Sequence, residues 1–314
     1  MRAVKVGPQP RSGVRVEVRN LVKIYRYKGG EVQALKGITA TFPPGVMTCV
    51  MGPSGSGKTT LLNLIGGVDI PTGGEVLVGN VQVHMLRGEH LDRFRLDNVG
   101  FVFQALNLIP SLTALENVIL PMTMAGVSRG KARARALKLL KLVGLEGKEG
   151  RYPEELSGGE QQRVAVAVAL ANNPPVILAD EPTAELDAEN ARVVTNLLLR
   201  LAREEGKTVI LSTHDPRVAV KADRILRLED GRIVGEHRPL DLESVLGGSG
   251  GGAAQVGLAE VIKVKMAAIE REIDELTTLF RRGEVGLEEF YSRLTRLKAV
   301  KEGLKELLTS VGVE

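Results

Sequence analysis

The sequence predicts an α/β fold in which helices pack on a central β-sheet. From residue 14 to about residue 240, short Val/Ile/Leu runs alternate with helical stretches. A glycine-rich loop joins one of these apolar runs to a helical pattern. Beyond a Gly/Ser-rich stretch the pattern changes to a purely helical one. We therefore predict a tail over residues 1–13, an α/β domain over 14–246, a linker over 247–254 and an α-helical hairpin over 255–314.

Composition is typical of a globular enzyme with a sizeable core. The chain has 314 residues, of which 43% are hydrophobic and 25% are charged. Its net charge of +4 would suit nucleic acid or an anionic membrane surface, but solvated surface charge accounts for it equally well. Cys49 is the single cysteine, which indicates a reducing compartment, and its apolar neighbours predict a buried thiol.

The chain shows no membrane-spanning or secretory pattern. No apolar run approaches the roughly eighteen residues that a membrane span needs. Residues 1–13 lack the apolar core of a signal peptide. If the protein works at a membrane, we expect it to work through a partner.

The expected elements follow the apolar runs in order. Strands are predicted over 14–18, 46–51, 100–103, 176–179, 208–212 and 224–228. Helices are predicted after the glycine-rich loop, over 128–143, which is rich in Ala, Leu, Lys and Arg, and over 162–171.

The glycine-rich loop matches the P-loop pattern Gly-x4-Gly-Lys-Thr without a mismatch. It consists of Gly52, Pro53, Ser54, Gly55, Ser56, Gly57, Lys58 and Thr59, and the helix continues at Thr60. Glycines let backbone N–H groups point at phosphate oxygens, and the helix N-terminus adds a partial positive charge. Lys58 can reach the β- and γ-phosphates, and the Thr59 hydroxyl can ligate Mg²⁺. The alternative is a Gly/Ser-rich surface turn.

Two carboxylates end the apolar strand over 176–179. Beside the P-loop strand, Asp180 would lie near a Mg²⁺ ion and Glu181 near the γ-phosphate. Glu181 would then polarise the attacking water. Without a P-loop, the same pattern would fit an acidic turn before Pro182.

A second helix N-terminus lies at Leu-Ser-Gly-Gly-Glu-Gln, residues 156–161. Ser157 is placed to cap the helix, and Gly158 and Gly159 let a ligand approach its end. Ser157 and Glu160 also form a capping-box pattern. An anion site and a capped helix are both compatible with these residues.

The order of these motifs resembles the nucleotide-binding subunits of ABC transporters. The P-loop is followed by Gln104, by residues 156–161, by Asp180 and Glu181, and by His214. The resemblance covers about residues 14–240. It implies a P-loop NTPase cassette with a mixed β-sheet core, an antiparallel β-subdomain and a helical subdomain that carries residues 156–161. It also implies a Mg²⁺-dependent ATPase that converts ATP to ADP and phosphate.

The resemblance assigns roles to residues of this chain. Tyr25 would stack on adenine, and His214 would contact the γ-phosphate. Gln104 would ligate Mg²⁺ and water and sense a membrane partner. Asp187 would link two nucleotide sites. The implied catalytic residues are Glu181, His214, Gln104 and Lys58, and the implied metal ligands are Thr59, Gln104 and Asp180.

Family members act in pairs on a membrane partner. Two ATP-binding subunits meet head to tail, and ATP lies between the P-loop of one and Ser157, Gly158, Gly159 and Glu160 of the other. The expected partners are this second subunit, homo- or heteromeric, and an integral-membrane permease that docks on residues 106–124. The expected location is cytoplasmic, peripheral on the inner face of the cell membrane. Residues 100–118 and 178–183 resemble the macrolide-exporter and lipoprotein-releasing group.

Two positions depart from the family pattern. Val168 stands where the family usually has Arg, and Glu185 stands where it usually has a small uncharged residue. Neither is a phosphate, metal or general-base position, so we expect an active enzyme.

Two other functions fit the same cassette. One is a soluble ABC ATPase acting on DNA or ribosomes, but the chain has one cassette, no long insertion and only 3% aromatic residues, so we expect no nucleic-acid partner. The other is an ATPase that regulates division or cell-wall remodelling without transport.

The C-terminal segment predicts two amphipathic helices joined by a turn over 281–286. Their apolar stripes are Ile262, Met266, Ile269, Ile273, Leu276 and Phe280, then Leu287, Phe290, Leu294, Leu297, Val300, Leu304 and Leu307. The hairpin is either a dimerisation or partner-docking element, or it buries its stripes internally or against the main domain.

Overall fold

The computed structural model describes residues 12–237 and, further along, residues 273, 276, 277, 280, 290, 293–295, 297, 298, 302 and 305. The chain forms two compact units, residues 1–239 and residues 240–314. Within the described residues, no helix has the length and apolarity needed to cross a membrane.

A six-stranded sheet forms the centre of the first unit. Its strands, in spatial order, are β10 (Arg232–His237), β9 (Arg224–Glu229), β3 (Met47–Met51), β8 (Thr208–Thr213), β7 (Val176–Asp180) and β6 (Val99–Val102). All neighbours run parallel except β10, which is antiparallel to β9. Every residue of β7 and β8 is buried, as expected of parallel strands covered on both faces.

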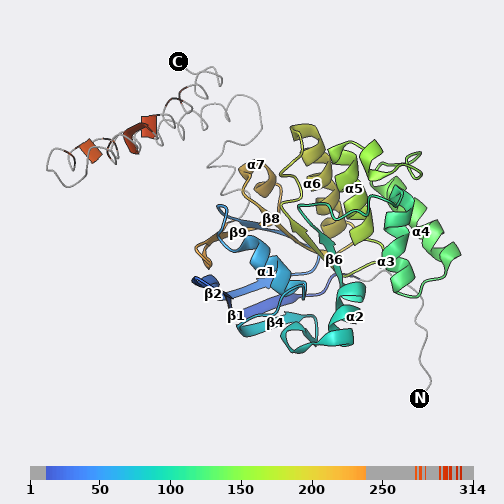
Figure 1. The fold of residues 1–314 in the computed structure, drawn as a ribbon, viewed down its shortest axis with the longest axis horizontal. Helices are drawn as coiled ribbons and strands as arrows, with labels where there is room; N and C mark the ends of the chain where they lie inside the picture. Colours follow the sequence, from blue (N-terminus) through green and yellow to red (C-terminus); the bar gives the residue numbers. More distant parts are fainter. Residues whose placement is uncertain are drawn as a thin grey trace. The chain divides into compact units, whose positions relative to one another are not determined.

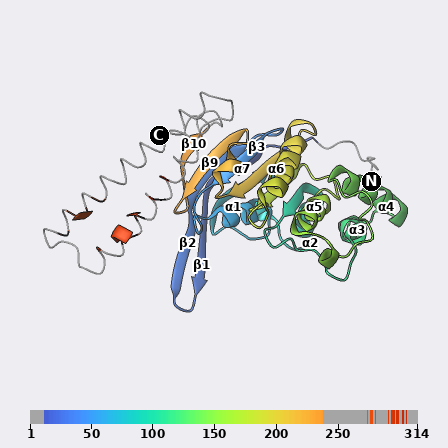
Figure 2. The same ribbon diagram turned by 90° about the horizontal axis from the view of Figure 1, so that it is seen from above.

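A second, antiparallel sheet has four strands. They lie in the order β2 (Gly30–Phe42), β1 (Val16–Tyr27), β4 (Gly73–Val78) and β5 (Val81–Gln82). Helix α1 (Lys58–Ile65) packs between the sheets, because its four buried leucine and isoleucine side chains join a core cluster with residues of both. The β1–β2 hairpin projects away from the rest of the unit (Figure 2).

The remaining helices are α2 (Gly88–Asn98), α3 (Ala114–Met124), α4 (Arg129–Leu142), α5 (Gly158–Ala169), α6 (Ala188–Arg203) and α7 (Pro216–Ala219), with short 3₁₀ turns at Val83–Met85 and Pro153–Glu155. Helices α3, α4 and α5 gather on one side, away from the antiparallel sheet (Figure 1). The predicted α/β fold, with a mixed core sheet, an antiparallel β-subdomain and a helical subdomain, is confirmed.

All six predicted strands are present, and the largest difference is in β1. It continues to Tyr27 instead of ending at residue 18 because it pairs with β2 along most of its length. A register shift after Val18 and the positive φ of Asn20 (47°) interrupt the alternation that marks a strand in the sequence. Strands β2, β4, β5 and β10 were not among the predictions.

The described residues of the second unit are all helical. Leu276 is buried, and the rings of Phe280 and Phe290 stack with centroids 4.2 Å apart. That contact joins the two stripes predicted for the hairpin. The tail over 1–11, the linker over 247–254 and the rest of the hairpin lie outside the described residues.

Candidate functional site

The predicted phosphate and hydrolysis residues meet at one edge of the parallel sheet. Met51 pairs with Thr213, and Asp180 pairs with Ser212, so β3, β7 and β8 end together. The P-loop, Glu181 and His214 follow these strand ends directly. Ligands of open α/β sheets bind at such carboxyl ends.

The P-loop needs glycine for two separate reasons. Gly57, the residue before α1, has a φ of 104°, which favours glycine, and a Cβ there would lie 2.7 Å from the Ala34 carbonyl oxygen. At Gly52 a Cβ would lie 2.0 Å from the Leu228 carbonyl oxygen, closer than atoms can approach. No side chain caps α1, so the N–H groups of its first turn remain available to an anion.

Lys58 is buried at the start of α1 and points back over the loop. Its Nζ donates to the carbonyl oxygens of Gly52 at 2.9 Å and Pro53 at 3.1 Å. The same nitrogen lies 3.3 Å from Oε1 of Glu181. Its ammonium group is thus held within the loop by acceptors that a phosphate could replace.

Glu181 is held in an unusual backbone conformation. Its φ is 46°, in the left-handed region that glutamate seldom adopts. Its N–H donates to the hydroxyl of Ser212 at 2.9 Å, and that hydroxyl donates to Oδ1 of Asp180 at 2.6 Å. Oε2 of Glu181 lies 2.9 Å from Nδ1 of His214. Ser212, which the sequence reasoning missed, therefore holds the Asp180 carboxylate and the Glu181 backbone.

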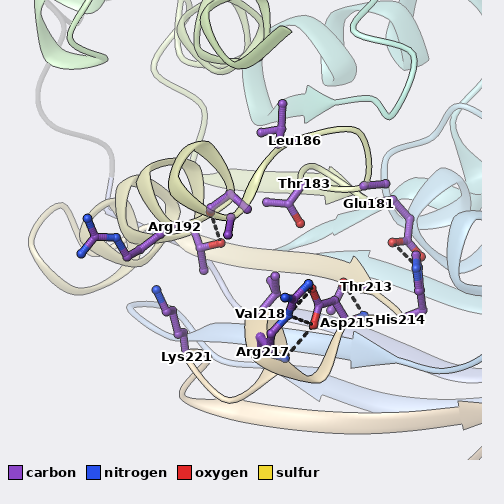
Figure 3. Close-up of a pocket in the computed structure, with 14 residues that line it drawn as sticks. Glu181, Thr183, Leu186, Arg192, Thr213, His214, Asp215, Arg217, Val218 and Lys221 are labelled. Atoms are coloured by element: carbon purple, nitrogen blue, oxygen red, sulfur yellow. Dashed lines mark hydrogen bonds and ion pairs between the residues drawn. The ribbon is translucent and has the colours of Figure 1, made fainter. Parts of the chain in front are cut away.

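A cavity of about 360 Å³ opens beside this pair. Figure 3 shows Glu181 and His214 at one end of the cavity and Arg192 and Lys221 at the other. The pKa of Lys221 is lowered, by partial burial first and by repulsion from Arg192 second. The Glu181–His214 pair therefore adjoins a space whose far end is basic.

The predicted adenine platform, Tyr25, lies in β1 and is 39% exposed. Its hydroxyl donates to Oδ2 of Asp69 at 2.8 Å. Partial burial is the main cause that raises the pKa of Tyr25; a hydrogen bond with Thr60 acts to lower it, and the hydrogen bond with Asp69 acts to raise it. Asp69 lies in the loop after α1 and was not identified from the sequence.

The N-terminus of α5 is closed by its own side chains. The Ser157 oxygen accepts from the Glu160 N–H at 3.4 Å, and the Ser157 N–H donates to Oε2 of Glu160 at 2.9 Å. Glu160 also forms an ion pair with Lys148. Hydrogen bonds from Lys148 and from the Ser157 backbone lower the pKa of Glu160. The predicted capping box is confirmed.

The two glycines at the start of α5, Gly158 and Gly159, have different surroundings. Ser157 and Gly158 are exposed, and a Cβ on Gly158 would meet nothing within 4 Å. Gly159 is buried, and a Cβ there would lie 2.4 Å from the Asn190 side chain. Gly159 is required by packing inside this chain, whereas Gly158 is open to an outside ligand.

Asp187 caps α6. Its carboxylate accepts from the Asn190 backbone N–H at 2.8 Å and from Nδ2 of Asn190 at 2.7 Å. Because Asn190 also packs against Gly159, the Asp187 turn and the start of α5 are neighbours. Asn190, like Ser212, was missed because neither residue belongs to a recognisable motif.

Gln104 is exposed in the loop after β6. Together with Gly158, Glu181 and Glu185 it lines a small cavity of about 50 Å³. The loop that follows is anchored by buried Asn117, whose Nδ2 donates to the Leu112 carbonyl at 2.9 Å and whose Oδ1 accepts from the Ile109 N–H at 2.8 Å.

The two departures from the family pattern lie outside the hydrolytic centre. Val168 lines a cavity of about 620 Å³ between α2, β6, α3 and α5. Glu185 is exposed in the turn before α6. Neither residue takes part in the hydrogen bonds that hold Lys58, Asp180 and Glu181.

Residues 35–184 match the family model described as "ABC transporter". The chain is 46% identical over 227 residues to the uncharacterised ABC transporter ATP-binding protein MJ0796 of Methanocaldococcus jannaschii, covering 71% of this chain and 97% of that protein. It is 44% identical to the lipoprotein-releasing system ATP-binding protein LolD of Syntrophotalea carbinolica, covering 72% and 99%.

A macrolide export ATP-binding/permease protein, MacB of Rhodospirillum rubrum, is 42% identical over 78% of this chain and 38% of its own length. Among solved structures, a dimeric post-hydrolysis state of the cassette MJ0796 bound to ADP and Pi superposes with a TM-score of 0.68 at 46% identity, covering 71% of this chain and 98% of that one. The chain belongs to the ABC transporter family, as one of its ATP-binding and ATP-hydrolysing subunits.

Proposed function

We propose that the chain pairs head to tail with a second ATP-binding subunit and that ATP is held between the P-loop of one and the α5 N-terminus of the other. The main observation is the open P-loop, in which Pro53, Ser54, Gly55 and Thr59 are all exposed around the uncapped start of α1. Exposed Gly158 supplies the complementary surface. ATP then bridges the two subunits, and its hydrolysis weakens their association.

Within each site the chain contributes positioning and charge. When a triphosphate binds, Lys58 exchanges the Gly52 and Pro53 carbonyls for phosphate oxygens. Glu181 then loses its contact with Lys58 and orients the attacking water as its proton acceptor, while His214 holds Oε2 and reaches the γ-phosphate. Asp187 contributes at the junction between the two sites. Catalysis by such fixed groups is electrostatic.

The residues at this edge fit a Mg²⁺ ion. The Thr59 hydroxyl, the Asp180 carboxylate and the Gln104 amide supply oxygen atoms, which are the ligands that Mg²⁺ prefers. Asp180 is buried, and its Oδ1 is oriented by Ser212. Bound Mg²⁺ would neutralise charge on the β- and γ-phosphates.

We propose that the membrane partner is a permease docked at the cavity beside Val168. This cavity adjoins the end of the 106–124 segment and is lined by apolar residues of β6 and α3, including Phe101, Pro121 and Met124. Met124 is 70% exposed. The likeness to LolD and MacB supports lipoprotein release or export. We propose mechanotransmission as a further use of the same subunit, which would lie peripherally on the inner face of the membrane.

We further propose that residues 255–314 form a separate helical hairpin after a linker over 247–254. The division of the chain after residue 239 and the Phe280–Phe290 stack support this organisation.

Site-specific cross-linking in native membranes tests the permease assignment. Cys49 is fully buried, so a Met124→Cys variant carries one reactive thiol for a photo-crosslinker. We expect Met124→Cys to capture an integral-membrane protein and Val234→Cys, a control at another exposed position (54%) on β10, to miss it. Capture of soluble proteins alone at Met124 would contradict the proposal and favour a soluble ABC ATPase.

A further inference from the structure

Lys23 and Asp69 form a partly buried ion pair beside the Tyr25 ring. Nζ of Lys23 lies 2.6 Å from Oδ1 of Asp69, and the side chains are 12% and 28% exposed. The same Nζ donates to the Ile70 carbonyl at 2.7 Å and lies 4.8 Å from the centroid of the Tyr25 ring. That distance is within the range of a cation–π interaction. Lys23 therefore covers one face of the Tyr25 ring, and the exposed part of Tyr25 remains available to a ligand.

The Asp69 carboxylate accepts hydrogen bonds from three groups. Oδ1 accepts from Lys23 and from the Ile70 N–H at 2.7 Å, and Oδ2 accepts from the Tyr25 hydroxyl. Burial acts to raise the pKa of Asp69, but the hydrogen bonds from Lys23, Tyr25 and Ile70 outweigh it and lower the pKa. The carboxylate is thus ionised at neutral pH and holds the tyrosine hydroxyl in one direction.

Asp69 is joined to the phosphate site by a single helix. The N–H groups of Val68 and Asp69 donate to the Asn63 carbonyl at 2.9 and 3.2 Å, which fixes the loop on the last turns of α1. The first residue of α1 is Lys58. A rigid element therefore connects the P-loop to the group that orients Tyr25.

We propose that Asp69 is a positioning residue for nucleotide binding. Acting through the Tyr25 hydroxyl and together with Lys23, it holds the aromatic platform at a fixed distance and direction from the P-loop. Base and triphosphate then bind to surfaces that are arranged in advance, which reduces the ordering cost of binding. This inference rests on the proposed stacking of adenine on Tyr25.

Competition binding on the full-length chain tests the inference. ATP and inorganic triphosphate are each used to displace a ribose-labelled fluorescent ATP analogue from Tyr25→Phe, Asp69→Asn and the double variant. We expect each single variant to bind ATP about three- to tenfold more weakly, less than the full effect of one hydrogen bond to a charged group, because the lost bond acts on the nucleotide only through the Tyr25 ring. Triphosphate affinity should not change, because it involves no base. The loss in the double variant should be smaller than the sum of the two single losses, since both variants weaken the Tyr25–Asp69 hydrogen bond.

The matched control is Glu75→Gln, which makes the same carboxylate-to-amide change at an exposed residue of β4. Oε2 of Glu75 lies 3.5 Å from Nη1 of Arg19, a residue of β1. Should Asp69→Asn fail to fold, Asp69→Glu takes its place, because it keeps the charge but displaces the acceptor of the Tyr25 hydroxyl. Tyr25→Phe alone does not decide, since it also removes an interaction with Thr60.

Three results would overturn the inference, and they are distinguishable. If Asp69→Asn weakens the binding of ATP and of triphosphate equally, the role of Asp69 is to support α1. A further variant, Tyr25→Ala, removes the ring. If Tyr25→Ala weakens ATP binding but not triphosphate binding, while Tyr25→Phe and Asp69→Asn bind both as wild type does, adenine stacks on Tyr25 but Asp69 does not position it. If Tyr25→Ala leaves the ratio of ATP to triphosphate affinity unchanged, the base contact itself is wrong.

Discussion

The helices α1 and α5 both begin at a glycine-rich motif, yet their N-termini are in opposite states. At α1 the cap residue is Gly57 in a left-handed conformation, and no side chain bonds to the first turn. At α5 Ser157 and Glu160 satisfy each other, and Glu160 is paired with Lys148. An anion can enter the first site directly, whereas the second presents an already capped surface. This difference supports the proposal that one chain supplies a phosphate site and a surface that completes the site of another chain.

The largest effect is expected at the hydrolytic carboxylate on the α1 side. Glu181→Gln should lower Mg²⁺-dependent phosphate release at least about a hundredfold, the usual contribution of a general base. ATP binding should persist, because Lys58 and the P-loop are unchanged. Phosphate-release and equilibrium-binding assays check both parts. Wild-type turnover in the variant would remove Glu181 from the mechanism.

A substitution at Gly158 sharpens the comparison on the α5 side. Gly158→Asp should abolish ATP-dependent pairing, because it places a negative charge where the phosphates of ATP on a second subunit would lie. The stability of its own chain should change by less than about 0.5 kcal/mol, since a Cβ there meets open space. Gly130→Asp, in the first turn of α4 and equally open, is the matched control. Light scattering and urea unfolding give the two readouts, and unimpaired pairing by Gly158→Asp would contradict the account.

The caps of α5 and α3 have the same geometry, which separates structural from functional effects. Ser157→Ala and Thr113→Ala each remove the side-chain half of a capping box and should each cost about 1 kcal/mol of unfolding free energy. Only Ser157→Ala should also weaken ATP-dependent pairing. Equal effects of the two variants on pairing would show that loss of stability alone explains the change.

The smallest expected effect is a change in the stability of the folded chain at low pH. The pKa of Glu160 is lowered in the folded chain, mainly by Lys148 and then by the Ser157 N–H, so its stabilising contribution is complete above the unfolded-state pKa of about 4.3. That contribution is lost as the pH falls through the lower, folded-state pKa. Urea unfolding should therefore show a stability difference between wild type and Glu160→Gln at pH 7 that shrinks below about pH 4. A difference that grows in acid would mean that the sign is wrong.

The contiguous parts of the site could be predicted from sequence, and the parts assembled across the fold could not. Lys58, Asp180 and His214 follow strands that the apolar runs identify, so their shared sheet edge was predictable. Ser212 and Asn190 act through strand register and helix packing, which leave no local pattern in the chain. Asp69 reaches Tyr25 only because the loop after α1 returns to β1, through the bond from the Thr72 N–H to the Val22 carbonyl. The β1–β2 hairpin was missed because its bulges break the alternation of a regular strand.

A mixing experiment tests most directly whether two chains share each ATP. Lys58→Ala removes the P-loop cation and Gly158→Asp removes the complementary surface, so neither variant alone should form an ATP-dependent pair. Mixed in equal amounts in the Glu181→Gln background, they can build one intact site from the P-loop of the Gly158→Asp chain and the α5 terminus of the Lys58→Ala chain. The account predicts an ATP-dependent heterodimer that retains one nucleotide. No pairing and no retained nucleotide in the mixture would contradict it.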